Sequence, residues 1–273
     1  MCYEIGMQAM RRQGPARLAH TEYCSNHALV RAVTGLPAPV NVNASAVEAA
    51  ENNGQDAWRA FNDAWQIDFL WITDDGPIPW EKRGRVTDMG HAEFLEGGID
   101  RRDTIRCPFK DVEEVWSFDA VEEYGLPPMV ELVRYYEGFH HKKQAANPNQ
   151  VCTGGYYKTL ISGAIQAFGW DMLLLAASDR ARFDKVLEGF FRLSLYHFQA
   201  WAKTSVKVFI CHDDMVWAQG PFMRPEFYRR AIFPRYKMLW DVLHQANKIV
   251  LYCSDGNWTE FVDDVAAAGA DGF

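Results

Sequence analysis

A thiol and a carboxylate lie two residues apart where the apolar run 249–253 ends and continues into "CSDGN" (253–257). Side chains alternate along a strand, so Cys253 and Asp255 are expected on one face, and Gly256 lets the backbone turn closely around a ligand. These two residues could therefore bind a metal ion such as zinc. In the alternative interpretation, Cys253 is a small buried apolar residue and Asp255 bonds the free backbone N–H groups of the next helix.

Two adjacent carboxylates, Asp213 and Asp214, follow the apolar run 206–212, in the sequence "CHDD". Asp214 is predicted to point toward the strand ends, where it could bind a substrate N–H or transfer a proton, while Asp213 faces the helices. His212 is a further candidate for substrate binding, although a histidine that closes a strand is commonly only hydrogen-bonded structure. Asp214 and Asp255 are the predicted catalytic pair.

Three more residues are candidates for substrate binding, with weaker support. Glu22 lies in "ARLAHTEYC" (16–24), which we interpret as a first strand, and Tyr156 follows the glycine pair 154–155. Asn257 precedes Glu260 by three residues, a variant of the capping box, and so also marks the start of a helix.

The elements that must position these residues alternate between strands and helices. Such alternation is typical of βα units around a parallel sheet, and nearly continuous apolar runs indicate strands that are covered on both faces. The carboxyl ends of parallel strands carry the chemistry in such folds, because the following loops and helix N-termini converge there. The predicted strands are 16–24, 66–72, 150–155, 206–212 and 249–253.

The helices have clear signals. Apolar residues at three- and four-residue spacing predict a long helix over 178–204, capped at Ser178 or Asp179. A second helix over 225–247 should kink or split at Pro234, which removes a backbone hydrogen bond. The segment 74–128 is rich in glycine and charge and is interpreted as an insertion that forms a lid or a wall.

Composition and charge indicate which classes of protein and partner fit this chain. Hydrophobic residues make up 48% of the 273 residues, which is typical of a globular protein. The net charge of −8 and the lack of a lysine or arginine run argue against nucleic-acid and membrane partners. Six dispersed cysteines and no signal peptide or membrane span favour a cytoplasmic protein with free thiols.

The C-terminal residues carry a resemblance to a known family. The segments "CHDDMVWAQGPFMRPEFYRRAIFPRY" and "CSDGNWTEFVDDVAAAGADGF" resemble the uroporphyrinogen decarboxylase superfamily, in which one strand ends in Asp-Asp and the next in "H-x-C-G-N" or "H-S-D-G-N". The match is strong over about the last 70 residues, extends through much of the chain from residue 150, and is loose in the N-terminal half. It implies a single (β/α)8 TIM-barrel domain over residues 1–273. Five strands are recognised, so we expect a barrel that is incomplete at its C-terminus, with about five of eight βα units.

The superfamily divides into porphyrinogen decarboxylases and corrinoid-linked methyltransferases. The methyltransferase branch implies a zinc that activates a thiol and a corrinoid on a partner protein, but here Cys253 and Asp255 stand at the positions of the zinc-binding His and Cys. The decarboxylase branch implies a tetrapyrrole substrate and no cofactor, yet its arginine-rich N-terminal signature is absent. We therefore expect an enzyme that transfers methyl groups between a corrinoid and a small substrate. A uroporphyrinogen decarboxylase and a non-catalytic ligand-binding barrel remain as alternatives.

Overall fold

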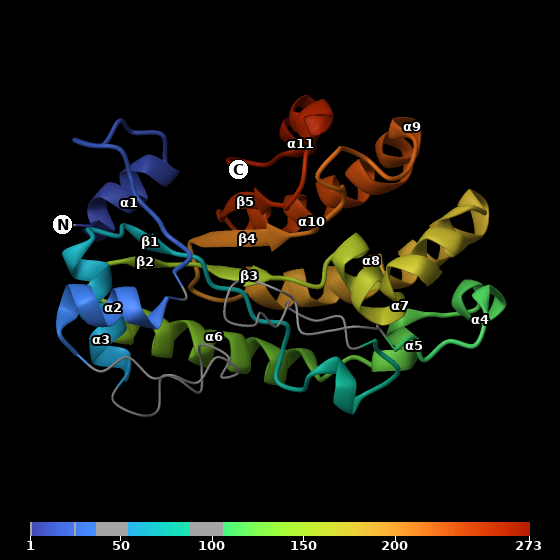
Figure 1. Ribbon diagram of the computed structural model, residues 1–273, viewed down its shortest axis with the longest axis horizontal. Coiled ribbons are helices and arrows are strands. Elements are labelled where there is room, and N and C mark those ends of the chain that lie inside the picture. Colours follow the sequence, from blue (N-terminus) through green and yellow to red (C-terminus); the bar gives the residue numbers. More distant parts are fainter. Residues whose placement is uncertain (1, 25, 37–53, 88–105) are drawn as a thin grey trace. The chain divides into compact units, whose positions relative to one another are not determined.

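The computed structural model describes residues 2–24, 26–36, 54–87 and 106–273, and is a mixed α/β structure with parallel strands (Figure 1). The chain divides into two compact units. The first comprises residues 1–72 and 138–153, and the second comprises 73–137 and 154–273. Each is described separately below.

The first unit contains a two-stranded parallel sheet in which β1 (Phe69–Leu70) pairs with β2 (Val151–Cys152). The hydroxyl of Thr153 donates to Leu70 O at 3.0 Å and accepts from Ile72 N at 2.9 Å, which ends the regular pairing. The helices of this unit are α1 (Cys2–Met10), α2 (His27–Thr34), α3 (Gly54–Ala64) and the end of α6 (Met129–Ala146).

Helices α2 and α3 pack through a small apolar core of Val30, Ala57 and Phe61. Helix α2 begins at Asn26, whose side chain accepts a hydrogen bond from Leu29 N, and it ends at Gly35 in the left-handed conformation. The two helices are therefore fixed by ordinary caps and one apolar seam.

The predicted first strand over 16–24 is wrong, because this segment is not a strand in the structure. Side chains anchor it instead of a backbone ladder: Arg17 forms a two-pronged ion pair with buried Asp68 at 2.6 and 2.7 Å. The Thr21 hydroxyl donates to Phe69 O at 2.8 Å. These side-chain bonds hold the segment beside β1 without strand pairing.

The second unit is built on three parallel strands in the order β3-β4-β5 (Figure 1). Strand β4 is buried at all five positions, as expected for a strand covered on both faces. The predicted strands 206–212 and 249–253 are confirmed, whereas the predicted strand 150–155 is divided between β2 and β3. The strands are β3 (Gly154–Tyr156), β4 (Val208–His212) and β5 (Ile249–Cys253).

Long helices pack against these strands. The predicted helix 178–204 is confirmed as α8 (Arg180–Ala202), capped by the side chain of Asp179. The predicted helix 225–247 is split, as expected near Pro234, into α9 (Pro225–Phe227), a π-helical turn η2 (Tyr228–Ile232) and α10 (Phe233–Gln245). The other elements of this unit are η1 (Trp80–Lys82), α4 (Val112–Trp116), α5 (Ala120–Tyr124), the start of α6, α7 (Leu160–Ala177), η3 (Thr259–Phe261) and α11 (Val262–Ala268).

Helix α7 is long and apolar enough to cross a membrane by length and composition, but 61% of it is buried inside the protein. It packs against α8 and belongs to the core of the second unit. The predicted insertion over 74–128 supplies η1, α4 and α5, and its residues 88–105 lie outside the described residues. Its role as a lid or a wall stays a prediction.

Candidate functional site

The register of β3, β4 and β5 sorts the predicted residues onto two faces. Tyr156, Cys211 and Tyr252 are paired across the three strands, and one position later His212 is paired with Cys253. Because side chains alternate, the first three share one face, and His212 and Cys253 share the other. The ring of Tyr157 stacks on His212 with a centroid separation of 3.9 Å.

Two strand ends meet through Asp214 and Asp255. The Asp214 carboxylate accepts a hydrogen bond from Asp255 N at 2.8 Å, and the same oxygen lies 3.5 Å from His212 Nε2. The structure thus brings together five side chains, which we call the strand-end cluster: Tyr157, His212, Asp214, Cys253 and Asp255.

Buried Asp213 holds this cluster in place from the helix face, as the alternation of side chains predicts. Its two carboxylate oxygens accept from Ser162 N and from the Tyr236 hydroxyl, both at 2.6 Å. The Ser162 hydroxyl in turn accepts from Asp214 N at 2.8 Å. Burial raises the pKa of Asp213 to about 6. Helices α7 and α10 therefore fix the backbone that presents Asp214.

The loop after β5 is fixed by a close backbone contact. Gly256 has a φ of 85°, and a Cβ there would lie 2.7 Å from Trp217 O. Asn257 N donates to Trp217 O at 2.8 Å, while the Asn257 side chain accepts from Thr259 N at 3.2 Å. Asn257 thus forms a turn just before η3, whose N-cap is Trp258 without a side-chain cap, so the predicted capping role of Asn257 is wrong. Its role in substrate binding stays a prediction.

The strand-end cluster combines proton acceptors with protonated donors. Burial, with smaller contributions from Asp214 and Asp255, raises the pKa of the Cys253 thiol to about 12. Burial first, and Asp214 next, also raise the pKa of the Tyr157 hydroxyl well above its ordinary value. At neutral pH the thiol and the phenol are therefore donors beside two carboxylates.

The donor set for a metal ion is incomplete. Within residues 2–24, 26–36, 54–87 and 106–273, no three His, Cys, Asp or Glu side chains gather in a way that could hold a metal ion. Cys253 and Asp255 alone supply one soft and one hard donor, and the thiol must lose its proton before it can bind. The residues present do not fit a zinc site of the kind that the sequence resemblance implies.

Asp75 and Lys158 also border the strand-end cluster, and the sequence reasoning missed both. Asp75 accepts from Tyr157 N at 2.8 Å and from Lys158 N at 3.3 Å, and its other oxygen lies 3.8 Å from Lys158 Nζ. The signal was available, because Asp74 and Asp75 follow a predicted strand in the same way as Asp213 and Asp214. These two residues were instead assigned to the predicted insertion over 74–128.

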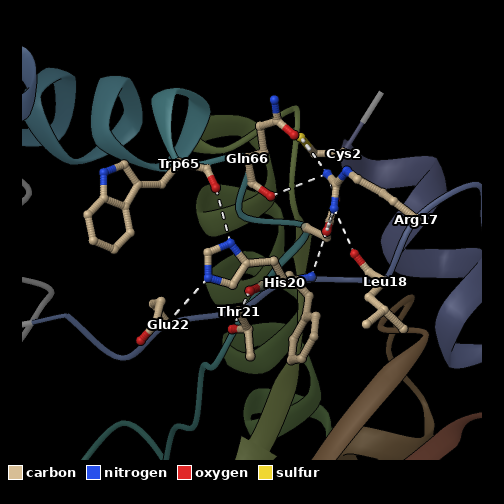
Figure 2. Close-up of polar contacts among 10 residues, drawn as sticks. Cys2, Arg17, Leu18, His20, Thr21, Glu22, Trp65 and Gln66 are labelled. Atoms are coloured by element: carbon tan, nitrogen blue, oxygen red, sulfur yellow. Dashed lines mark hydrogen bonds and ion pairs between the residues drawn. The ribbon is translucent and has the colours of Figure 1, made fainter.

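Two predicted substrate-binding residues lie elsewhere. Tyr156 lies on the opposite face from His212, and its ring stacks on His197 at 4.8 Å. Glu22 belongs to the first unit, where Figure 2 shows it beside His20, with 3.5 Å between Glu22 Oε1 and His20 Nε2. The role of either residue in substrate binding stays a prediction.

Comparisons with known proteins bear on the fold. No family model matches the chain, and no curated protein matches it. Among solved structures, the chain is similar to a methyltransferase from Methanosarcina mazei, with a TM-score of 0.60 and 12% sequence identity. The match covers 99% of this chain and 74% of that chain. At this identity the likeness shows a methyltransferase-like fold and nothing finer.

Proposed function

We propose that this chain is a methyltransferase of the uroporphyrinogen decarboxylase superfamily, which transfers a methyl group between a corrinoid and a small substrate. The observation that carries the proposal is the hydrogen bond from Asp255 N to Asp214, which fixes the Asp214 carboxylate against the loop that follows β5. The methyltransferase-like fold of the Methanosarcina mazei structure supports it. A (β/α)8-type barrel, a cytoplasmic location and a corrinoid protein as partner belong to the same proposal.

The carboxylates supply the proton chemistry that methyl transfer needs. A thiol or an ammonium group that accepts a methyl group must lose a proton, so that its lone pair forms the new bond to carbon. We assign Asp214 as the base that takes this proton, because its position is fixed by Asp255 N and Ser162 Oγ. Asp255 adds negative charge that favours a cationic or proton-donating substrate. A corrinoid, when bound, supplies the methyl group on its cobalt.

The Cys253 thiol is assigned a neutral role in this scheme. With a pKa of about 12 it is protonated at neutral pH, so it can donate a hydrogen bond but is a poor nucleophile. No step is assigned to a metal ion, because the donor set does not fit one.

A uroporphyrinogen decarboxylase is the alternative function, and the strand-end cluster disfavours it. A substrate with eight carboxylates requires a cationic cleft. Here the Asp214 carboxylate bonds the backbone of a second acidic residue, Asp255, and the nearby ammonium group of Lys158 is 3.8 Å from the carboxylate of Asp75. Such a site repels a polycarboxylate.

A demethylation assay tests the proposal. The chain is incubated with methylcobalamin and a panel of small thiols and amines, and loss of the methyl–cobalt bond is followed by absorbance. We expect turnover that falls by about 10²-fold or more in Asp214→Asn, because general-base catalysis contributes on that order. Asp263→Asn, an exposed carboxylate on α11, is the matched control and should keep full activity.

Two results would contradict the proposal. One is unchanged turnover in Asp214→Asn. The other is a wild-type chain that leaves methylcobalamin intact with every acceptor. Decarboxylation of uroporphyrinogen in a parallel assay would then favour the alternative function, and no reaction in either assay would favour a non-catalytic ligand-binding barrel.

A further inference from the structure

Arg83 has no carboxylate partner among the described residues. It follows η1 in the second unit, and its Nε is buried with no hydrogen-bond partner among the described residues. No ion pair to the Arg83 guanidinium is found in the described part of the chain, whereas the guanidinium of Arg85, two residues later, binds the Glu123 carboxylate at 2.9 and 3.1 Å. Burial lowers the pKa of Arg83, and the surrounding tyrosines and Asp75 offset this only in part.

Two fully buried groups near Arg83 also lack partners. The Tyr156 hydroxyl and His197 Nε2 are both buried, and neither has a hydrogen-bond partner among the residues that the structure describes. His197 Nδ1 lies 2.6 Å from the Tyr136 hydroxyl. Burial first, and the charge of Arg83 next, lower the pKa of His197 to about 3, so the ring is neutral. The Nε2 atom of this neutral ring therefore has hydrogen-bonding capacity that no described residue uses.

A cleft of about 200 Å³ opens beside the guanidinium. Its other walls are mostly apolar, and one of them is Tyr124, which stacks on Trp80 at 4.1 Å. A half-buried cation at the side of an apolar cleft is the arrangement that binds an anion with an apolar body. The residues that line the cleft with Arg83 are Pro77, Ile78, Tyr124, Gly125, Leu126 and Pro127.

Asp75 is the described carboxylate whose charge acts on Arg83, and it is engaged elsewhere. Its carboxylate already accepts from Tyr157 N and Lys158 N and lies 3.8 Å from Lys158 Nζ. Native proteins leave few buried polar groups unpaired. An arginine that lines a cleft and has no ion-pair partner among the described residues therefore indicates a place for a hydrogen-bond acceptor from outside the chain.

We propose that Arg83 and this cleft form a binding site for a small monocarboxylate with an apolar body. The planar guanidinium matches a carboxylate with two parallel N–H···O bonds. The apolar walls suit a short aliphatic or aromatic stem and disfavour a strongly hydrated dianion such as phosphate. The site is distinct from the strand-end cluster, and it stands whether or not the proposed methyl transfer is correct.

Calorimetric titration of the full chain with benzoate tests the site, at ionic strength held constant with sodium chloride. We expect saturable binding with a Kd in the millimolar range, as is typical of so small a ligand. Benzamide has the same shape without the charge and should bind at least about tenfold more weakly, because charge-assisted hydrogen bonds are the stronger ones. Inorganic phosphate should also bind more weakly than benzoate.

Three variants locate the binding. Arg83→Gln should weaken benzoate binding about tenfold or more, and Leu126→Trp should weaken it by filling the cleft from a position that is 42% exposed. Arg85→Gln is the matched control, because that arginine is already paired, and it should bind benzoate like the wild type. Arg83→Gln should melt no lower than the wild type, since it removes an uncompensated charge.

The proposal is overturned by any of three outcomes. These are no saturable benzoate binding in the wild type, undiminished binding in the folded Arg83→Gln and Leu126→Trp variants, or phosphate binding as tight as that of benzoate. Should Arg83→Gln fail to fold, Leu126→Trp decides the question, because its side chain is at the surface.

Discussion

Two polar regions of the second unit differ in how their hydrogen bonds are satisfied. Buried Asp213 uses both carboxylate oxygens, one for Ser162 N and one for the Tyr236 hydroxyl. Arg83 Nε, by contrast, has no partner among the described residues. A closed network fixes a backbone, whereas an open one costs stability unless a ligand completes it. The difference suggests that Asp213 is there for structure and Arg83 for binding.

The largest effect should come from opening the closed network. Asp213→Ala leaves Ser162 N and the Tyr236 hydroxyl buried without an acceptor, so we expect it to lower the free energy of unfolding by about 3 kcal/mol. Urea denaturation at pH 7 measures this. Asp263→Ala, on the exposed side of α11, is the control and should change stability by less than about 0.5 kcal/mol. A loss below about 1 kcal/mol for Asp213→Ala would show that the network is not what fixes this strand end.

In the region around Arg83, the free energy of unfolding should depend on pH through His197. The folded-state pKa of His197, about 3, lies below its ordinary value of 6.5, so its stabilising contribution is complete above pH 6.5 and is lost as pH falls toward 3. Between pH 7 and pH 5 this amounts to about 2 kcal/mol. The variant His197→Asn removes this titrating group.

The test therefore compares the free energies of unfolding of the wild type and of His197→Asn. The free energy of unfolding of the wild type minus that of His197→Asn should decrease by about 2 kcal/mol from pH 7 to pH 5, with other titrating groups cancelling. Asp213 titrates in both proteins and is removed by the subtraction. A difference that is constant with pH would mean that water reaches the His197 ring.

A smaller effect is expected at the loop that follows β5. Gly256→Ala combines an unfavourable φ of 85° with a close contact to Trp217 O, and we expect a loss of about 1.5 kcal/mol. Gly220→Ala is the matched control, because it has a φ of 127° but nothing within 4 Å of the added Cβ. Thermal melts should rank Gly256→Ala as the less stable variant. Equal melting temperatures would show that the loop moves aside without cost.

The strands that the sequence predicted best are those buried on both faces. The runs that became β4 and β5 are continuous and apolar, and they were found to within two residues. The predicted strand 16–24 failed because Arg17 and Thr21 bond to residues 68 and 69 far along the chain, and such pairing leaves no local pattern.

The candidate site shows the same limit. Alternation along the strands correctly assigned Asp213 to the helices, because the period of two is local. The contact of Asp255 N with Asp214 depends on the loop turn at Gly256, and the unpaired state of Arg83 depends on which carboxylates fold near it. Neither can be read from spacing, since each is set by residues distant in the chain.

The wide π-helical turn at Tyr228–Ile232 has a consequence for how this chain can vary in length. Phe233 N bonds Tyr228 O, five residues back, so the turn holds one residue more than an α-helical turn, and it ends just before Pro234, which has no N–H to donate. Removal of exposed Arg230 would shorten the wide turn to an α-helical one, with one carbonyl still unpaired because Pro234 has no N–H to donate. The turn is therefore the place in this helical segment where the loss of a single residue should disturb α9 and α10 least.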